Sequence, residues 1–301
     1  MNGYAAAAVA VLIWASYPVA TRAGVTGSFS PQELVTLRFG VGALLFLPYL
    51  LLNLRAIRPE AWLQGLPLAV FQGAGMGALV IWGLQIAPAN HQAALGPGVL
   101  SAWVALLGFL VFARRPSARL VAGALLCASG VLMIVWWGLR ENNTAVLAGD
   151  AMFLAASALG ALYVLQLRNW GVSATQGAAI VTLYSALAVV PWYLWSSPAP
   201  LWRAAPLELL WQVLWQGVLI GCLAFIAFNH AVAKLGAERS SAMVALVPVL
   251  TAILAMAFLG EVPSHAEIAA FLVISAGVSV AASRGYSGRP AADSAPMKRS
   301  A

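Results

Sequence analysis

Long apolar segments follow one another along almost the whole chain, separated by short stretches that carry Gly, Pro, Asn and most of the basic residues. A helix that crosses a bilayer needs about 20 mostly apolar residues. These segments are that long, and most are apolar on every face rather than on one stripe. The pattern therefore predicts an all-α, polytopic membrane protein with ten transmembrane helices. We place them at residues 3–24, 31–54, 61–87, 90–112, 117–138, 146–168, 174–196, 207–233, 238–259 and 265–283.

The last five segments repeat the first five. Residues correspond at a nearly constant offset: Gly3 with Gly149, Tyr17 with Tyr163, Arg22 with Arg168, Pro48 with Pro191, Pro116 with Pro263, and Gly130 with Gly277. A unit with an odd number of crossings must lie upside down relative to its copy. Inverted repeats are typical of secondary transporters, whose substrate site lies between the repeats. We expect the first repeat at residues 1–141, the second, inverted repeat at 142–284 and a disordered basic tail at 285–301.

Composition and charge support the membrane assignment. Of the 301 residues, 62% are hydrophobic and 8% are charged, whereas soluble domains carry about 25% charged residues. The net charge of +7 comes from short loops and not from one basic face, so we expect no nucleic-acid partner. If the N-terminus is cytoplasmic, the opposite side keeps Arg22, Arg140 and Arg203, and the other basic residues of the loops and tail face the cytoplasm. This positive-inside bias predicts that both termini lie in the cytoplasm.

Two groups of residues carry a resemblance to a known family. Trp14-Ala15-Ser16-Tyr17-Pro18 with Arg38-Phe39-Gly40 resembles the first two helices of the drug/metabolite transporter superfamily. Asn229-His230-Ala231, Val247-Pro248-Val249 and Leu259-Gly260-Glu261 resemble its second EamA-type repeat. The resemblance covers about residues 3–283, and within the superfamily the chain most resembles bacterial YddG-type exporters of aromatic and other neutral amino acids. The first half departs from the pattern where Ala113-Arg114-Arg115 stands in place of Gly260-Glu261.

Ionisable side chains are scarce in the middle of the expected helices. Glu33, His91 and Asp150 lie toward helix ends on the outer side, from which such groups can reach the interface. His91 has no carboxylate partner at active-site spacing in the sequence. Because no acid lies at mid-membrane, we expect transport down the substrate gradient without a proton-carrying carboxylate. Arg38 lies deepest and is either held by helix-end carbonyls or Glu33, or contacts a substrate carboxylate.

Aromatic and amide side chains inside the helices are the candidates for a substrate cavity. A buried indole, phenol or amide needs a hydrogen-bond partner, which a water-filled cavity supplies, and plain helix packing is the alternative. The expected cavity residues are Trp14, Tyr17, Gln72, Met76, Trp82, Trp103, Tyr163, Tyr184 and Asn229. Tyr17 and Tyr163 occupy matching positions of the two repeats.

Proline and glycine positions suggest hinges and close helix contacts. Pro97 between Gly96 and Gly98, and Pro248 in the matching helix, each free a backbone carbonyl, and glycine permits large dihedral changes. We predict gating at these four residues, with a static kink as the alternative. The pairs Gly73-x-x-x-Gly77 and Gly217-x-x-x-Gly221 predict close packing against neighbouring helices, with a dimer interface as the alternative.

The leading hypothesis is a secondary transporter of the bacterial inner (plasma) membrane. It exports small neutral metabolites, chiefly aromatic and other neutral amino acids as the resemblance implies, by alternating access through a cavity between the repeats. A broad drug or cation extruder is the alternative, although it would need an acid or an aromatic cage. An intramembrane enzyme would need paired catalytic side chains, which the spacing does not offer. Cys127 and Cys222 fall inside apolar segments and suggest neither a disulfide nor a metal site. We expect a small-molecule substrate, the lipid bilayer as partner, no cofactor and a functional monomer.

Overall fold

The structure is a computed structural model. It describes residues 2–111, 113, 116–196, 201–236, 240, 243–244 and 246–282, without the side chains of Arg168, Ala174, Trp202, Phe225, Asn229 and Ala282. The expected tail at 285–301, Arg114 and Arg115, and the start of the expected helix at 238–259 lie outside the described residues.

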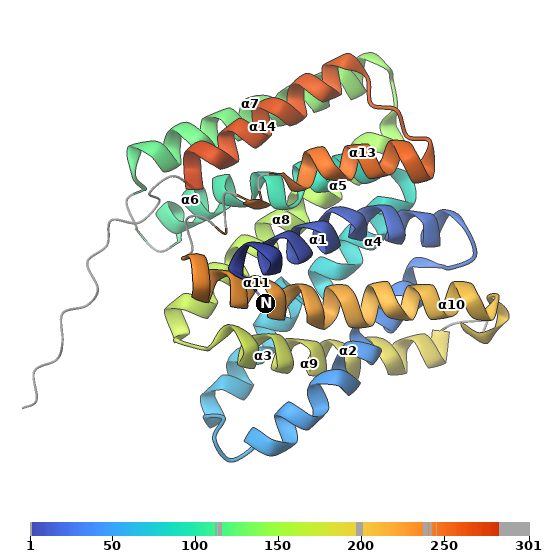
Figure 1. Ribbon diagram of the computed structural model, residues 1–301, viewed down its shortest axis with the longest axis vertical. Coiled ribbons are helices and arrows are strands. Elements are labelled where there is room, and N and C mark those ends of the chain that lie inside the picture. The colour runs from blue at the N-terminus through green and yellow to red at the C-terminus, as the bar shows by residue number, and fades with distance from the viewer. Residues whose placement is uncertain are drawn as a thin grey trace, which may run out of the picture.

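The described part of the chain is helical and contains no strand (Figure 1). Its elements are α1 (Gly3–Thr26), α2 (Pro31–Asn53), α3 (Pro59–Phe71), α4 (Ala74–Ile86), α5 (Ala89–Leu95), η1 (Pro97–Val99), α6 (Leu100–Leu110), α7 (Ala118–Arg140), α8 (Thr144–Trp170), α9 (Ala174–Ser196), η2 (Leu201–Arg203), α10 (Pro206–Gln212), η3 (Val213–Leu223), α11 (Ala224–Leu235), α13 (Val247–Leu259) and α14 (His265–Ala282). Elements η1 and η2 are 3₁₀ turns, and η3 is a π-helix.

Eight segments of the described chain are long and apolar enough to cross a membrane. They are Gly3–Thr26, Pro31–Asn53, Pro59–Ile86, Ala89–Leu110, Ala118–Arg140, Thr144–Leu167, Thr175–Ser196 and Pro206–Leu235. Val247–Leu259 and His265–Ala281 are apolar but shorter. The all-α, multi-pass expectation is confirmed, while the count of ten crossings stays a prediction.

Local sequence signals fix the ends of several helices. At the start of α2, Ser30 and Glu33 form a capping box and Pro31 occupies the first turn, which satisfies backbone donors that have no partner within the helix. At the end of α8, Gly171 adopts φ +63°, a left-handed conformation that glycine reaches without steric cost. These signals explain why the expected boundaries of the two helices lie close to the observed ones.

Three helices that the sequence predicts as continuous are not regular α-helices. The expected helix at 61–87 divides into α3 and α4 at Gln72–Gly73, and the expected helix at 90–112 divides into α5, η1 and α6 at Gly96–Pro97. The expected helix at 207–233 changes to π-helical hydrogen bonding over η3. Glycine and proline weaken the helical hydrogen-bond ladder at the first two positions, and π-segments recur at functional sites.

The helices pack in pairs that draw on both halves of the chain. In Figure 1, α7 and α14 run side by side along one edge of the bundle, and α2 lies beside α9 at the other. Helix α1 packs on α11 and α13, while α8 packs on α4 and α6. Glycines permit the closest approach, since a Cβ at Gly123 of α7 would lie 2.6 Å from the carbonyl oxygen of Gly277 of α14.

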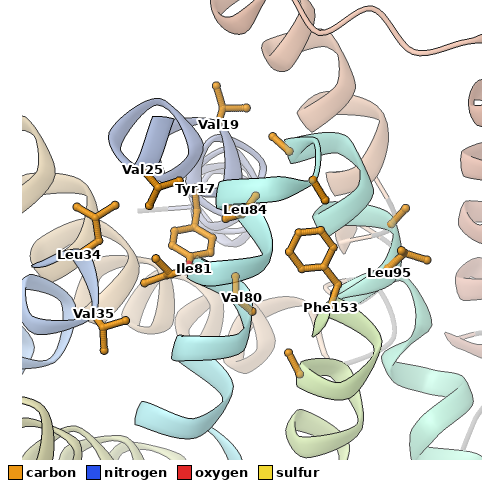
Figure 2. Close-up of a cluster of buried hydrophobic side chains, with 14 of the residues drawn as sticks. Tyr17, Val19, Val25, Leu34, Val35, Val80, Ile81, Leu84, Leu95 and Phe153 are labelled. Atoms are coloured by element: carbon orange, nitrogen blue, oxygen red, sulfur yellow. The ribbon is translucent and has the colours of Figure 1, made fainter. Parts of the chain in front are cut away.

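The largest apolar cluster lies between α1, α2, α4, α5 and α8. Figure 2 shows Tyr17 of α1 reaching toward Ile81 of α4, with Val80 and Leu84 on the same helix. Phe153 of α8 fills the space beside Leu95 of α5 and is fully buried. A Cβ at Gly83 would lie 2.5 Å from the Phe153 ring, so α4 and α8 are fitted closely at this point.

Candidate functional site

A cavity of about 70 Å³ lies among α2, α8, α9, η3 and the break between α3 and α4. It is lined by Arg38, Phe39, Gln72, Tyr163, Ala178, Val181, Thr182 and Gly221. The lining joins one cation, one amide, a phenol and a hydroxyl to an apolar wall. Residues from both halves of the chain therefore meet at one cavity, whose lining is partly polar and partly apolar.

Arg38 is the charged member of this lining. Its guanidinium donates to the Tyr17 hydroxyl, and its central carbon lies 5.0 Å from the Tyr17 ring centroid and 5.6 Å from that of Phe39. Glu33 instead accepts from the Ser30 backbone N–H at 2.7 Å. Within the described residues Arg38 forms no ion pair with a carboxylate. The aromatic faces supply cation–π attraction but leave the positive charge available to an anionic group.

Gln72 enters the cavity because the helix breaks at this residue. The backbone N–H of Ala74, which the break leaves without its helical partner, donates to the Ser185 hydroxyl of α9 at 3.0 Å. Gln72 and Met76 also face α8, since a Cβ at Gly160 would lie 3.7 Å from Gln72 Oε1 and 3.6 Å from Met76 Sδ. Gln72 thus shares the cavity lining with Tyr163 of α8, whereas Met76 contacts α8 without being part of that lining.

The described lining of the cavity does not include five other predicted cavity residues. Trp14 packs on Phe228 with ring centroids 4.9 Å apart, Tyr184 packs on Trp62 at 6.3 Å, and Trp82 lies 6.4 Å from Trp192. Trp103 is half-buried on α6. Asn229 belongs to α11, and its side chain lies outside the described residues. A role for these five in transport stays a prediction.

The cavity also contains residues that the sequence analysis did not single out. Ala178, Val181 and Thr182 are ordinary residues of apolar helices, and no spacing signal distinguishes them. Phe39 was noted only for the family resemblance and not as a cavity residue. Thr182 donates to the Ala178 carbonyl at 2.7 Å within its own helix. Gly221 could be noticed in the sequence because it is the second residue of the Gly217-x-x-x-Gly221 pair. In the structure it lies close to Gly42 of α2.

The proposed hinge at Gly96–Pro97–Gly98 is an actual interruption of the helix. The Gly96 carbonyl accepts from the Ser157 hydroxyl of α8 at 2.6 Å. Pro248 lies in the first turn of α13, where its missing N–H costs no hydrogen bond. The neighbouring Thr251 hydroxyl donates to the Ala15 carbonyl of α1 at 2.9 Å. Each proline is therefore accompanied by a side-chain bond to another helix, and movement at either stays a prediction.

Both glycine pairs pack inside the chain. A Cβ at Gly77 would lie 2.9 Å from the Phe39 ring, and one at Gly217 would lie 2.3 Å from the Val41 side chain. Both neighbours belong to α2. Close packing against neighbouring helices, the first of the two expected uses, is therefore observed for both pairs.

An ionic network joins the helix ends opposite the N-terminus of α1. His91 Nδ1 lies 2.8 Å from Asp150 Oδ1, and His91 Nε2 lies 2.7 Å from Glu267 Oε1. The prediction from sequence spacing that His91 has no carboxylate partner was therefore wrong. Asp150 and Glu267 are 59 and 176 residues away in the chain, so spacing could not reveal them.

A second ion pair lies beside this histidine. Arg22 of α1 pairs with Glu261, which follows α13, and donates to the carbonyls of Leu84 at 2.7 Å and Ala87 at 2.5 Å. Glu261 also accepts from the Ala89 backbone N–H at 2.9 Å. We call Arg22, His91, Asp150, Glu261 and Glu267 the ionic network. It ties the start of α5 to α1, α8 and the α13–α14 connection.

Comparison with known proteins identifies the family. The sequence profile of the EamA-like transporter family matches residues 1–136 and again residues 147–283. The chain belongs to the EamA-like transporter family, and it is a multi-pass membrane protein that acts in transport.

Individual relatives agree with this assignment. A Streptantibioticus cattleyicolor protein named probable terminal-alkyne amino-acid exporter is 27% identical over 220 residues, which cover 68% of this chain and 69% of that protein. The Bacillus subtilis protein named uncharacterized transporter YyaM is 24% identical over 265 residues, 82% of this chain and 83% of that protein. One crystal structure, 21% identical, superposes with a TM-score of 0.61 over 93% of this chain and 96% of that chain, which shows a shared fold.

Proposed function

We propose that this chain exports small solutes that bear a carboxylate, chiefly aromatic and other neutral amino acids, across the bacterial inner membrane by alternating access. The observation that carries the proposal is Arg38, a cation without a carboxylate partner in the described chain, at the edge of the cavity described above. The protein is proposed to work as a monomer without a cofactor, with both termini in the cytoplasm.

Corresponding helices of the two halves make corresponding contacts, which supports an inverted repeat. If the repeats at 1–141 and 142–284 are related by a twofold axis, every contact between them has a counterpart. Helix α1 packs on α11 and α13, and its counterpart α8 packs on α4 and α6. Helix α2 packs on η3 as α9 packs on α3, while α2 and α9 also pack on each other. Such an arrangement suits a site that two alternating gates expose in turn.

The lining of the cavity favours an amino acid over a simple anion. The guanidinium of Arg38 provides charge-assisted hydrogen bonds that fit a carboxylate. Gln72, Tyr163 and Thr182 offer neutral polar contacts, and Phe39 adds an aromatic surface. The name of the 27% identical relative, an amino-acid exporter, points the same way.

A cation extruder is less compatible with this site. An organic cation in the cavity would meet the positive charge of Arg38, and the described lining contains no carboxylate to offset it. Like charges at short distance in a low-dielectric interior repel strongly. The family and the named relatives favour transport over catalysis.

Binding of a matched ligand series tests the role of Arg38. We expect the purified parent to bind phenylalanine more tightly than phenylalanine amide, which lacks the carboxylate. Arg38→Gln should weaken phenylalanine binding by about 10- to 100-fold, the effect of losing a charged hydrogen bond, and leave the affinity for the amide unchanged. Arg38→Lys should be intermediate because it keeps the charge but loses the planar fork.

The control is Arg203→Gln, which removes an exposed arginine at the end of η2. It should bind both ligands as the parent does. If Arg38→Gln retains the parent affinity for phenylalanine, Arg38 is a structural residue and the carboxylate site lies elsewhere.

A further inference from the structure

His91 is held between two carboxylates from different helices. Its ring nitrogens lie 2.8 Å from Asp150 of α8 and 2.7 Å from Glu267 of α14. Only 4% of His91 and 2% of Asp150 is exposed, and Phe271 packs against the imidazole with ring centroids 6.2 Å apart. None of these three residues lines the substrate cavity described above.

The two contacts of His91 require one proton more than a neutral imidazole and two ionised carboxylates contain. A neutral imidazole has one N–H, so it can donate to one carboxylate only, and its other nitrogen would present a lone pair to the second. Two hydrogen bonds at these distances need an imidazolium or a protonated carboxylic acid. The second Asp150 oxygen, Oδ2, is buried without a hydrogen-bond partner, so the stability of this carboxylate depends on His91.

We propose that His91, Asp150 and Glu267 form a proton-binding site that keeps the outer side of the transporter closed while the proton is bound. The inference rests on the alternating access proposed above. The site connects α5 of the first half to α8 and α14 of the second. Loss of the proton removes one of the two hydrogen bonds across this junction and leaves a buried carboxylate facing a lone pair, which is costly in a low-dielectric interior.

The charges around α5 determine the direction of the effect. The ionisable groups that face its start are Arg22 from α1, Asp150 from α8, Glu261 from the α13–α14 connection and Glu267 from α14. The described residues of α4 and η1 contain no ionisable side chain. With an imidazolium, two cations face three carboxylates, and without it one cation faces three. Deprotonation therefore increases repulsion among the acids and favours separation of the helices.

The sequence offers no equivalent device at the other end of the bundle. Where the second half has Gly260-Glu261, the first half has Ala113-Arg114-Arg115. In the sequence, Arg168 corresponds to Arg22, and the first half has two basic residues at the position where the second half has the acid that pairs with Arg22. We therefore expect the proton-dependent contact to act on the outer side, so that pH shifts the balance between the two open states.

Distances between spin labels on the outer ends of two helices test this inference without a substrate. Cysteines replace the exposed Ser28, after α1, and the exposed Thr144, at the start of α8. The background is Cys222→Ala, because Cys127 is buried. In lipid nanodiscs, raising the pH from about 6 to about 10.5, from below the ordinary histidine pKa of about 6.5 to several units above it, should increase the population with the longer distance.

The His91→Gln variant can donate to one carboxylate but cannot gain a proton. It should show the high-pH distance distribution of the parent at both pH values. Glu267→Gln is the second variant, because glutamine can still accept from the Ser264 N–H that Glu267 now bonds at 2.5 Å. Its amide N–H can donate to the lone pair of a neutral His91 ring. Both contacts then form without the extra proton, so this variant should keep the low-pH distance distribution of the parent at both pH values. The control Glu141→Gln changes an exposed acid at the same end and should keep the parent response.

Two results would overturn the inference: parent distances that are equal at both pH values, or a pH response that persists in both His91→Gln and Glu267→Gln. Distances that change on adding phenylalanine but not with pH would overturn the proton site alone and leave the proposed transport function in place.

Discussion

At the scale of single residues, one serine stabilises the break beside the cavity. Ser185 of α9 accepts from the Ala74 N–H, 111 residues away in the chain, and only 1% of it is exposed. A Cβ at Gly73 would lie 2.0 Å from the serine oxygen, so the glycine and the hydroxyl form one contact. This pair positions Gln72 in the cavity.

Replacing Ser185 by Ala should therefore destabilise the protein. The change leaves the part-buried N–H of Ala74 without its partner, which costs up to about 1–3 kcal/mol, and should lower the midpoint of thermal unfolding in detergent. Ser129→Ala is the matched control, because Ser129 is exposed and donates to Leu126 within its own helix at 2.8 Å. Equal midpoints for the two variants would show that the break does not depend on Ser185.

The residue scale also shows how far sequence reasoning reaches. Gln72, Tyr163 and Arg38 could be selected because polar groups inside apolar helices need partners, and all three line the cavity. The aromatic residues followed the same rule, yet Trp14 and Tyr184 find aromatic neighbours instead. Sequence position does not distinguish a side chain that faces a cavity from one that faces another helix.

At the scale of helices, the positions of the apolar segments were predictable, whereas their interruptions were predictable only in part. About 20 apolar residues suffice to indicate a span, so α1, α2 and α9 lie where they were expected. The break at Gly96–Pro97 carried a local signal, since proline follows glycine. The break at Gln72–Gly73 depends on a contact with Ser185 from a distant helix, which no local pattern reports.

Pro97→Ala tests whether the interruption between α5 and α6 moves during transport. Alanine restores a backbone donor that can bond the Ala93 carbonyl, so the segment should stiffen. We expect transport to slow several-fold while equilibrium binding of phenylalanine changes less than about two-fold, as for a residue that gates. The measurement is initial flux beside binding affinity in the same preparation.

The control for this variant is Pro67→Ala, which removes a proline inside α3 for which we predict no gating role. It should transport at the parent rate. If Pro97→Ala also transports at that rate, the interruption is static and serves only to shape the bundle.

At the scale of the whole molecule, helices from both halves of the chain line one cavity of mixed polar and apolar character, and the ionic network joins the two halves at one end. Helices α7 and α14 pack through Gly123, Gly130 and Gly277 at the edge, away from the cavity lining. The lining contains a cation and no described carboxylate. The carboxylates of the ionic network lie at helix ends, so a proton bound there can bias a gate without crossing the membrane with the substrate.

The most direct test of this account is the uptake of labelled phenylalanine into liposomes that contain the purified protein, with equal pH on both sides. We predict saturable uptake down the substrate gradient, faster when unlabelled phenylalanine is loaded inside, and strongly reduced for Arg38→Gln. Protein-free liposomes give the background. Uptake no greater than this background, or uptake that occurs only with an imposed pH gradient, would contradict the account.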